Sequence, residues 1–91
     1  MYTIYKYPLR IKEEQELVLP IFSRILSVET QRANIVLYAL VDTDTPGKTH
    51  LTVYIRGTGY PADGLQDATF IGTVKMLDGA LMYHIFYKGG D

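Results

Sequence analysis

Apolar and polar residues alternate along most of this chain, and turn-forming residues separate the alternating runs. The clearest run, THLTVYIR, places Leu51, Val53 and Ile55 at every second position. Successive side chains of a strand point to opposite faces, so this pattern predicts a β-strand with one covered face. No stretch shows the three- and four-residue apolar spacing that is typical of a helix. The alternation therefore predicts an all-β protein.

Six further runs have strand character, and glycine, proline, asparagine or aspartate lies between most of them. Pro8 has no amide hydrogen, which predicts an edge or a bend in the first run. We expect one β domain over residues 1–91, an antiparallel β-sandwich or small barrel of about seven short strands, with a frayed tail at 88–91. The six runs are YTIYKYPLRI (2–11), ELVLP (16–20), SRILSVETQ (23–31), NIVLYALVD (34–42), FIGTVKM (70–76) and LMYHIFY (81–87).

Local patterns predict the connections and faces of these runs. NIVLYALVD is apolar on both sides, which indicates a strand that is covered on both faces. In SRILSVETQ, the alternation places Leu26 and Val28 on one face. We expect a hairpin around 32–34, with Asn34 adopting positive φ, and a second hairpin turn at Asp78-Gly79.

Composition excludes several classes of function. The net charge is −1, and the nine basic residues are scattered, which does not favour binding to duplex nucleic acid. The chain has no cysteine, so thiolate metal sites, disulfides and cysteine nucleophiles are excluded. No apolar run is long enough to span a membrane, and the first ten residues do not resemble a signal peptide. We expect a soluble protein without a membrane partner.

The loop RGTGYPADG contains glycines at the spacing of a dinucleotide-binding fingerprint, Gly57-x-Gly59-x-x-Ala62. That fingerprint requires a helix directly after the glycines, and no helical pattern follows here. Two interpretations remain open. The glycines supply unusual dihedral angles for a bulge and a turn, or the segment binds an anion through backbone amides. The candidate ligand-binding residues are Arg56, Gly57, Thr58, Gly59 and Tyr60.

Other possible chemical motifs are incomplete. Pro46–Thr49 contains Gly-Lys-Thr, but neither the earlier glycine nor the helix of a phosphate-binding loop is present. Asp42, Asp44 and His50 are too few for a convincing metal site. His84 alternates with apolar neighbours in a strand, and no nucleophile, base and orienting residue are found together. We expect no catalytic residues, no metal, no cofactor and no enzymatic activity.

The chain has eight tyrosines, more than one small core can bury with every hydroxyl satisfied. Some of them should therefore lie on a surface, and tyrosine is favoured where proteins contact one another. The candidate interface residues are Tyr5, Tyr7, Tyr54, Tyr83, His84 and Tyr87.

Four segments, IYKYPL, LYALVD, RGTGYP and FIGTVKMLDGALMYHIF, together resemble a family of small tailed-phage proteins that is known as a domain of unknown function. The similarity extends from Ile4 to Phe86. The resemblance implies a phage protein that works in the cytoplasm of an infected bacterium, and it supplies no catalytic residues.

In that setting the first hypothesis is a non-enzymatic accessory protein that binds a host protein, such as a component of a defence system, as a homo-oligomer. The second hypothesis is a small-molecule binder that sequesters a nucleotide signal. The third is a minor structural protein of the virion. The residues alone leave the three hypotheses open.

Overall fold

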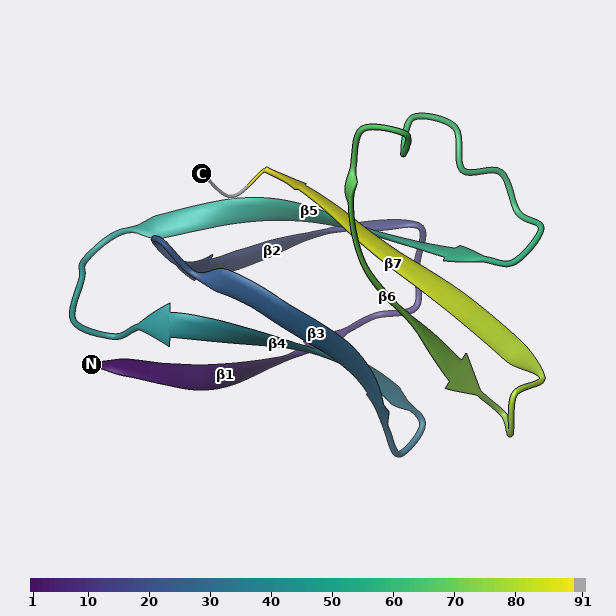
Figure 1. Cartoon of the computed structure of the whole chain (residues 1–91), viewed down its shortest axis with the longest axis horizontal. Helices are drawn as coiled ribbons and strands as arrows, with labels where there is room; N and C mark the ends of the chain where they lie inside the picture. The colour runs from purple at the N-terminus through teal and green to yellow at the C-terminus, as the bar shows by residue number, and fades with distance from the viewer. Residues whose placement is uncertain (90–91) are drawn as a thin grey trace.

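Within residues 1–89, which the structure describes, seven strands build two antiparallel sheets and no helix is present (Figure 1). The structure is a computed structural model. One sheet has the order β1-β4-β3 and the other the order β2-β5-β7-β6, which confirms the predicted all-β antiparallel sandwich. The strands are β1 (Tyr2–Leu9), β2 (Glu14–Pro20), β3 (Arg24–Gln31), β4 (Asn34–Asp42), β5 (Lys48–Gly57), β6 (Thr69–Met76) and β7 (Leu81–Gly89).

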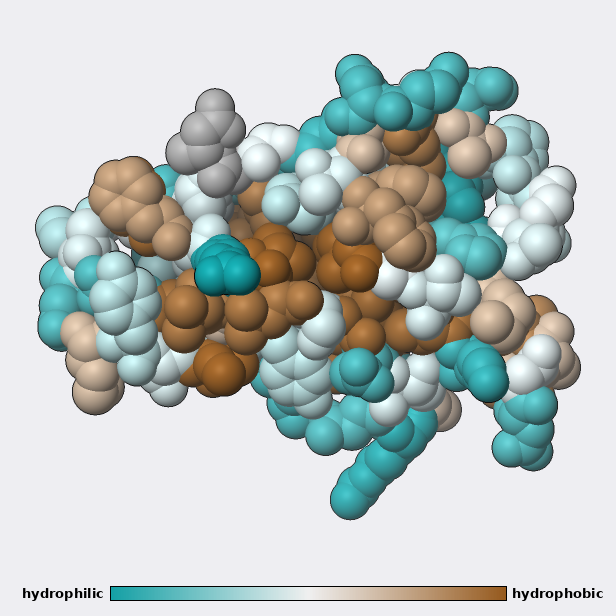
Figure 2. Space-filling model, viewed as in Figure 1, coloured by the Kyte–Doolittle hydropathy of each residue, from teal (hydrophilic) through white to brown (hydrophobic). Residues whose placement is uncertain are grey.

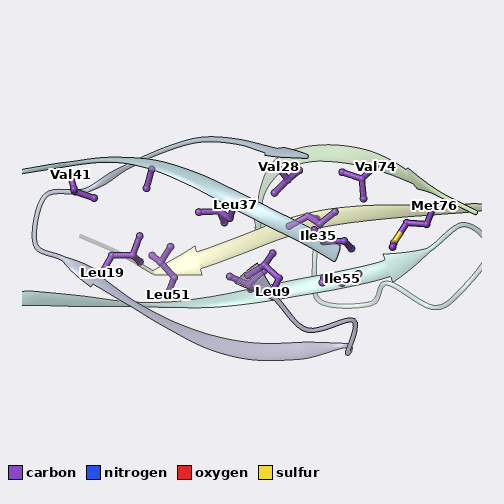
Figure 3. Close-up of a cluster of buried hydrophobic side chains, with 13 residues drawn as sticks. Leu9, Leu19, Val28, Ile35, Leu37, Val41, Leu51, Ile55, Val74 and Met76 are labelled. Atoms are coloured by element: carbon purple, nitrogen blue, oxygen red, sulfur yellow. The ribbon is translucent and has the colours of Figure 1, made fainter. Parts of the chain in front are cut away.

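The core is a single apolar layer between the two sheets, and Figure 3 shows side chains from both sheets pointing into it. Alternate residues of β4 point inward and are fully buried, while alternate residues of β5 face them from the other sheet. The predicted inward face of β5 is confirmed. The buried cluster comprises Leu9, Leu19, Val28, Ile35, Leu37, Ala39, Val41, Leu51, Val53, Ile55, Val74, Met76 and Ile85.

The outer face of the central strand β4 is covered only in part, because Tyr38 and Leu40 on this face are half-buried. Val36 points outward between Pro8 of β1 and Glu29 of β3, yet only 3% of its surface is exposed. The Nζ atom of Lys6 donates a hydrogen bond to Oε1 of Gln31 at 2.8 Å, and this contact joins the two strands that flank β4. β1 is an edge strand, which confirms the prediction from Pro8.

The two sheets close against each other along one side, where β3 meets β6. The Thr30 hydroxyl donates to the Lys75 carbonyl at 2.8 Å, and a Cβ on Gly72 would lie 3.1 Å from a methyl group of Val28. Apolar side chains form a band across the middle of the face that Figure 2 shows, while polar side chains dominate its rim. Residues 1–89 contain no helix with the length and apolar character needed to cross a membrane.

Two predictions about the β3–β4 hairpin are wrong. Arg32, with φ of 52°, adopts the positive φ that we expected for Asn34, because Asn34 is already paired with Gln31 in the sheet. Leu26 does not share the inward face of Val28. A bulge between Ile25 and Ser27 inserts one residue into the strand, and this extra residue leaves Leu26 exposed.

The β6–β7 turn and the tail also differ from expectation. Asp78-Gly79 lies within a four-residue loop, 77–80, in which Leu77, Asp78 and Gly79 all have positive φ. Lys88 and Gly89, assigned to a frayed tail, extend β7 because they pair with Thr52 and Leu51 of β5. The remainder of that predicted tail, residues 90–91, lies outside the described residues.

The loop after β4 is organised around the carboxylate of Asp42. Its Oδ2 accepts a hydrogen bond from the Thr45 hydroxyl at 2.6 Å, and its Oδ1 accepts one from the Asp44 amide at 3.1 Å. The N-terminal amino group of Met1 donates to the same carboxylate and to that of Asp44. The Thr45 hydrogen bond, followed by the Asp44 amide and the amino group, lowers the pKa of Asp42 from 3.8 to about 2.

These contacts predict an acid-dependent loss of stability. The lowered pKa means that the Asp42 contribution is fully present above about pH 4 and is lost as the pH falls toward 2. We expect Asp42→Asn to lower the melting temperature at neutral pH and to flatten its decline between pH 4 and 2, measured by circular dichroism. Asp78→Asn, in the exposed loop 77–80, removes the same charge and serves as the control. A decline of equal steepness in wild type and Asp42→Asn would contradict this assignment.

Candidate functional site

A cavity of about 490 Å³ opens at one end of the sandwich. It lies where the linker from β1 to β2, the end of β5 and the long β5–β6 loop meet, and Tyr83 of β7 forms part of its wall. Its lining mixes two apolar side chains, two aromatic rings, two cations and two carboxylates. The lining residues are Ile11, Lys12, Glu13, Ile55, Arg56, Gly57, Tyr60, Pro61, Asp63 and Tyr83.

Arg56 joins the three segments around this cavity. Its Nη1 donates to the backbone carbonyls of Glu13 at 2.6 Å and Ile55 at 3.1 Å, while its Nε donates to the carbonyl of Pro61 at 3.0 Å. A charged donor that satisfies three carbonyl groups fixes the positions of the linker and the loop. Arg56, expected to contribute a charge to a ligand, therefore also holds the walls of the cavity together.

The glycines act mainly through backbone shape. Gly59 has φ of 89°, and the Tyr60 amide donates to the Gly57 carbonyl at 3.1 Å, which closes a tight turn. A Cβ on Gly57 would lie 2.9 Å from the Tyr60 ring, so the ring packs directly on this backbone. The Thr58 amide donates a hydrogen bond to the Met82 carbonyl at 3.3 Å. Two of the amides that we expected to bind an anion therefore have partners within the chain.

Thr58 points away from the cavity and contacts His84. The His84 ring lies between two hydroxyl groups, with Nε2 at 2.7 Å from Thr58 Oγ1 and Nδ1 at 2.9 Å from Thr73 Oγ1. A hydroxyl group both donates and accepts, so these two satisfy both ring nitrogens. His84, a predicted interface residue, thus connects β7 to β6 and to the start of the long loop.

Lys88 attaches the far part of the long loop to the sheet. Its Nζ donates to the Gly64 carbonyl at 2.7 Å and lies 3.1 Å from the Asp67 carboxylate, whose pKa it lowers. The predicted interface residue Tyr54 lies between the two cations, with Arg56 Cζ at 5.9 Å and Lys88 Nζ at 5.7 Å from its ring centre. Leu65 of the loop is buried. The loop is therefore held by Arg56 near its start and Lys88 near its end.

The other predicted interface residues divide between the core and the surface. Tyr7, Tyr83 and Tyr87 pack against the buried cluster and are half-buried. Burial raises the pKa of Tyr7. Tyr5 remains exposed on β1, with its ring 6.3 Å from that of Tyr7 in an edge-to-face arrangement.

Sequence reasoning therefore found one wall of the cavity and missed the other. Arg56, Gly57 and Tyr60 line it as one segment, and Tyr83 joins them from β7. The lining residues that the predicted site did not include are Ile11, Lys12, Glu13, Ile55, Pro61 and Asp63. We expected Ile11 at the end of the first strand run, 2–11, and Lys12 and Glu13 lie between that run and the next. Ile11, an exposed apolar residue beside three charged ones, was the available indication.

The chemistry available at this end of the molecule is recognition by shape, aromatic contact and balanced charge. Lys12 and Arg56 are matched by Glu13 and Asp63 around the opening. Within residues 1–89, no three histidine, aspartate or glutamate side chains are grouped as a metal-binding set. The cavity is open and partly apolar, which suits the side chain of a partner or a small organic molecule.

Fold and cavity together define a small antiparallel β-sandwich with an open, partly apolar cavity at one end. The chain belongs to the family described as Domain of unknown function (DUF7352), whose model matches residues 1–91. This match confirms that the chain is a member of a family of unknown function over its whole length. Neither a curated protein nor a solved structure matches the chain.

The contacts of Arg56 predict that the long loop depends on this side chain. Arg56→Lys keeps the charge but cannot reach Glu13 and Pro61 at once, so we expect a loss of about 1–3 kcal/mol in the free energy of unfolding. Amide hydrogen exchange in residues 58–68 should accelerate. Arg24→Lys, at an exposed position of β3, is the matched control. Equal exchange in the two variants would show that Arg56 does not hold the loop.

Proposed function

We propose that this protein is a non-enzymatic binding protein that acts by occupying a surface of a partner protein, as a homo-oligomer. The observation that supports this proposal is Tyr60, which is 72% exposed at the rim of the cavity. Its ring packs on Gly57, and its amide closes the turn that Gly59 permits. An aromatic side chain held in place while exposed loses little conformational entropy on binding, so it is suited to anchor a partner.

The surroundings of Tyr60 support the same proposal. Exposed Ile11 lies on the opposite wall, and the charged residues around the opening provide a polar rim with both signs of charge. Protein interfaces commonly combine an aromatic anchor with a surrounding polar rim. The resemblance to small tailed-phage proteins supplies the proposed context: a phage protein in the cytoplasm of an infected bacterium, with a host defence component as its partner.

A plating assay with two matched aromatic variants tests this proposal. When expressed in bacteria that carry a defined defence system, the wild-type protein should restore plating of a restricted phage. We expect Tyr60→Ala to reduce this rescue at least about tenfold, as for the loss of an interface anchor. Phe22→Ala changes a ring that is 71% exposed in the β2–β3 turn, away from the cavity, and should retain rescue. Equal loss in both variants, or no rescue by the wild type with any system tested, would argue against the proposal.

The composition of the cavity favours one alternative, a binder that sequesters a nucleotide. Lys12 and Arg56 supply positive charge, and Tyr60 and Tyr83 supply aromatic walls. The volume of about 490 Å³ lies in the range of small-molecule sites. A ligand would place a phosphate group near Lys12, because Arg56 already donates to three carbonyl groups.

Native mass spectrometry of protein purified from bacteria without denaturation tests this alternative. A retained ligand should appear as an added mass in the nucleotide range, and Lys12→Ala should remove it. Lys48→Ala, at the exposed start of β5 and outside the cavity, should retain it. A spectrum of the wild-type protein with no added mass would leave protein recognition as the function of the cavity.

A further inference from the structure

The first strand, β1, is apolar but is left largely uncovered. Of its eight residues only Leu9 is buried, whereas Tyr2 and Ile4 are 68% and 57% exposed on one face and Tyr5 is 42% exposed on the other. It is also the outermost strand of its sheet, at the lower edge in Figure 1. A long apolar edge strand is a site at which another strand can pair.

The other three sheet edges of the described chain are protected. β3 and β6 cover each other through the Thr30–Lys75 hydrogen bond and the contact of Val28 with Gly72. β2, the remaining edge, carries Glu14 and Glu16, and charged residues discourage pairing at an edge. β1 carries a single charged residue, Lys6, so it is the least protected edge of the sandwich.

The position of Pro8 shows which backbone groups of β1 face outward. In an antiparallel pair, alternate residues exchange both hydrogen bonds with the neighbouring strand, and the residues between them direct both groups to the other side. Pro8 has no amide hydrogen, so it belongs to the outward set together with Tyr2, Ile4 and Lys6. The Met1 carbonyl accepts a hydrogen bond from Thr43 on the β4 side, which agrees with this alternation.

We infer that β1 pairs with β1 of a second copy of this chain, antiparallel about a two-fold axis, with Ile4 opposite Ile4 of the partner subunit. The two three-stranded sheets then form one continuous six-stranded sheet. This inference deepens the proposed function, because it names the surface and the geometry of the homo-oligomer on which that proposal rests.

The register follows from the residues that face outward. With Ile4 at the centre, Tyr2 faces Lys6 of the partner subunit, whose aliphatic stem can pack beside the aromatic ring while its ammonium group keeps the hydrogen bond to Gln31. Pro8 falls beyond the paired segment, because the partner strand begins at Tyr2. If Lys6 were the central residue, two like charges would lie opposite each other. If Tyr5 were the central residue, Pro8 would lie opposite Tyr2 of the partner subunit and would have no amide hydrogen to donate to it.

The exposed side chains of β1 contribute area to the pairing. A fully covered tyrosine buries about 150–250 Å², so the exposed parts of Tyr2, Ile4 and Tyr5 amount to about 300–400 Å² in each chain, which is the upper limit of what the pairing can cover. Together with the backbone edge, two chains bury at most about 1,000 Å², the low end for specific association.

Two lysine substitutions in edge strands test the inference by molar mass. We expect the wild-type protein at micromolar concentration to have twice the 10.3 kDa mass of one chain in analytical ultracentrifugation. Ile4→Lys places two like charges at the centre of the ladder and should give a monomer with an unchanged circular dichroism spectrum. Val18→Lys changes a β-branched residue that is 43% exposed on β2, the acidic edge strand of the other sheet, and should remain dimeric. A monomeric wild type would overturn the inference, and a dimer lost only in Val18→Lys would assign self-association to β2.

Disulfide cross-linking tests the register, since the chain has no cysteine of its own. A hydrogen-bonded antiparallel pair has Cα atoms about 5.5 Å apart, which a disulfide can span. Ile4→Cys should therefore cross-link to its partner on mild oxidation. Lys6→Cys should not, because the two substituted positions would be about 14 Å apart along the ladder. Efficient cross-linking of Lys6→Cys alone would overturn the register.

The test of the β1 pairing can fail or succeed independently of the test of the proposed function. Tyr60 lies in the β5–β6 loop and not on β1, so Tyr60→Ala should remain dimeric in the same ultracentrifugation experiment. A dimer without plating rescue would leave the β1 pairing intact and would contradict only the proposed host target. Rescue by a monomeric Ile4→Lys variant would show that target binding does not need the pairing.

Discussion

The structure depends on burial of the inner face of β4. Ile35, Leu37, Ala39 and Val41 are fully buried at the centre of the three-stranded sheet, and β5 faces them from the other sheet. A small domain has one modest core, so most of the free energy that offsets the entropy of folding comes from this layer. The closure of β3 against β6 and the position of the cavity both follow from how the sheets pack around it.

At the open end of the sandwich, side-chain hydrogen bonds hold the long β5–β6 loop in place, and apolar packing contributes less there. The long β5–β6 loop buries Leu65, and Arg56 and Lys88 bind its backbone carbonyls at two separate points. This arrangement gives an irregular segment a defined position and leaves Tyr60 both exposed and ordered. The cavity, the exposed ring and the two cations are thus parts of one structural unit. The β1 edge lies in the other sheet, so the proposed partner recognition and the inferred self-association would use different surfaces.

Much of the fold could be predicted because strand periodicity is a local property. Alternation identified most of the strands, Pro8 identified an edge, and the all-apolar character of β4 identified the central strand, which is buried on its inner face and partly covered on its outer face. The misassigned details were those that depend on a neighbouring strand. Leu26 follows the alternation but is turned outward by a bulge. Asn34, the residue expected to have positive φ, is instead paired with Gln31 in the sheet. Lys88 is polar and near the chain end, yet pairing with Thr52 extends β7 to include it.

For the candidate site, the sequence by itself determined the segment Arg56–Tyr60, because glycine and proline mark irregular backbone wherever they occur. It also determined that tyrosines exceed the capacity of the core. Only the tertiary structure decided that Ile11, Lys12 and Glu13 complete the cavity, that Arg56 donates to carbonyl groups from three segments, and that β1 rather than β2 is the unprotected edge. These features join residues far apart in the chain, whose distances are set by sheet order and by the packing of the two sheets and not by any local pattern.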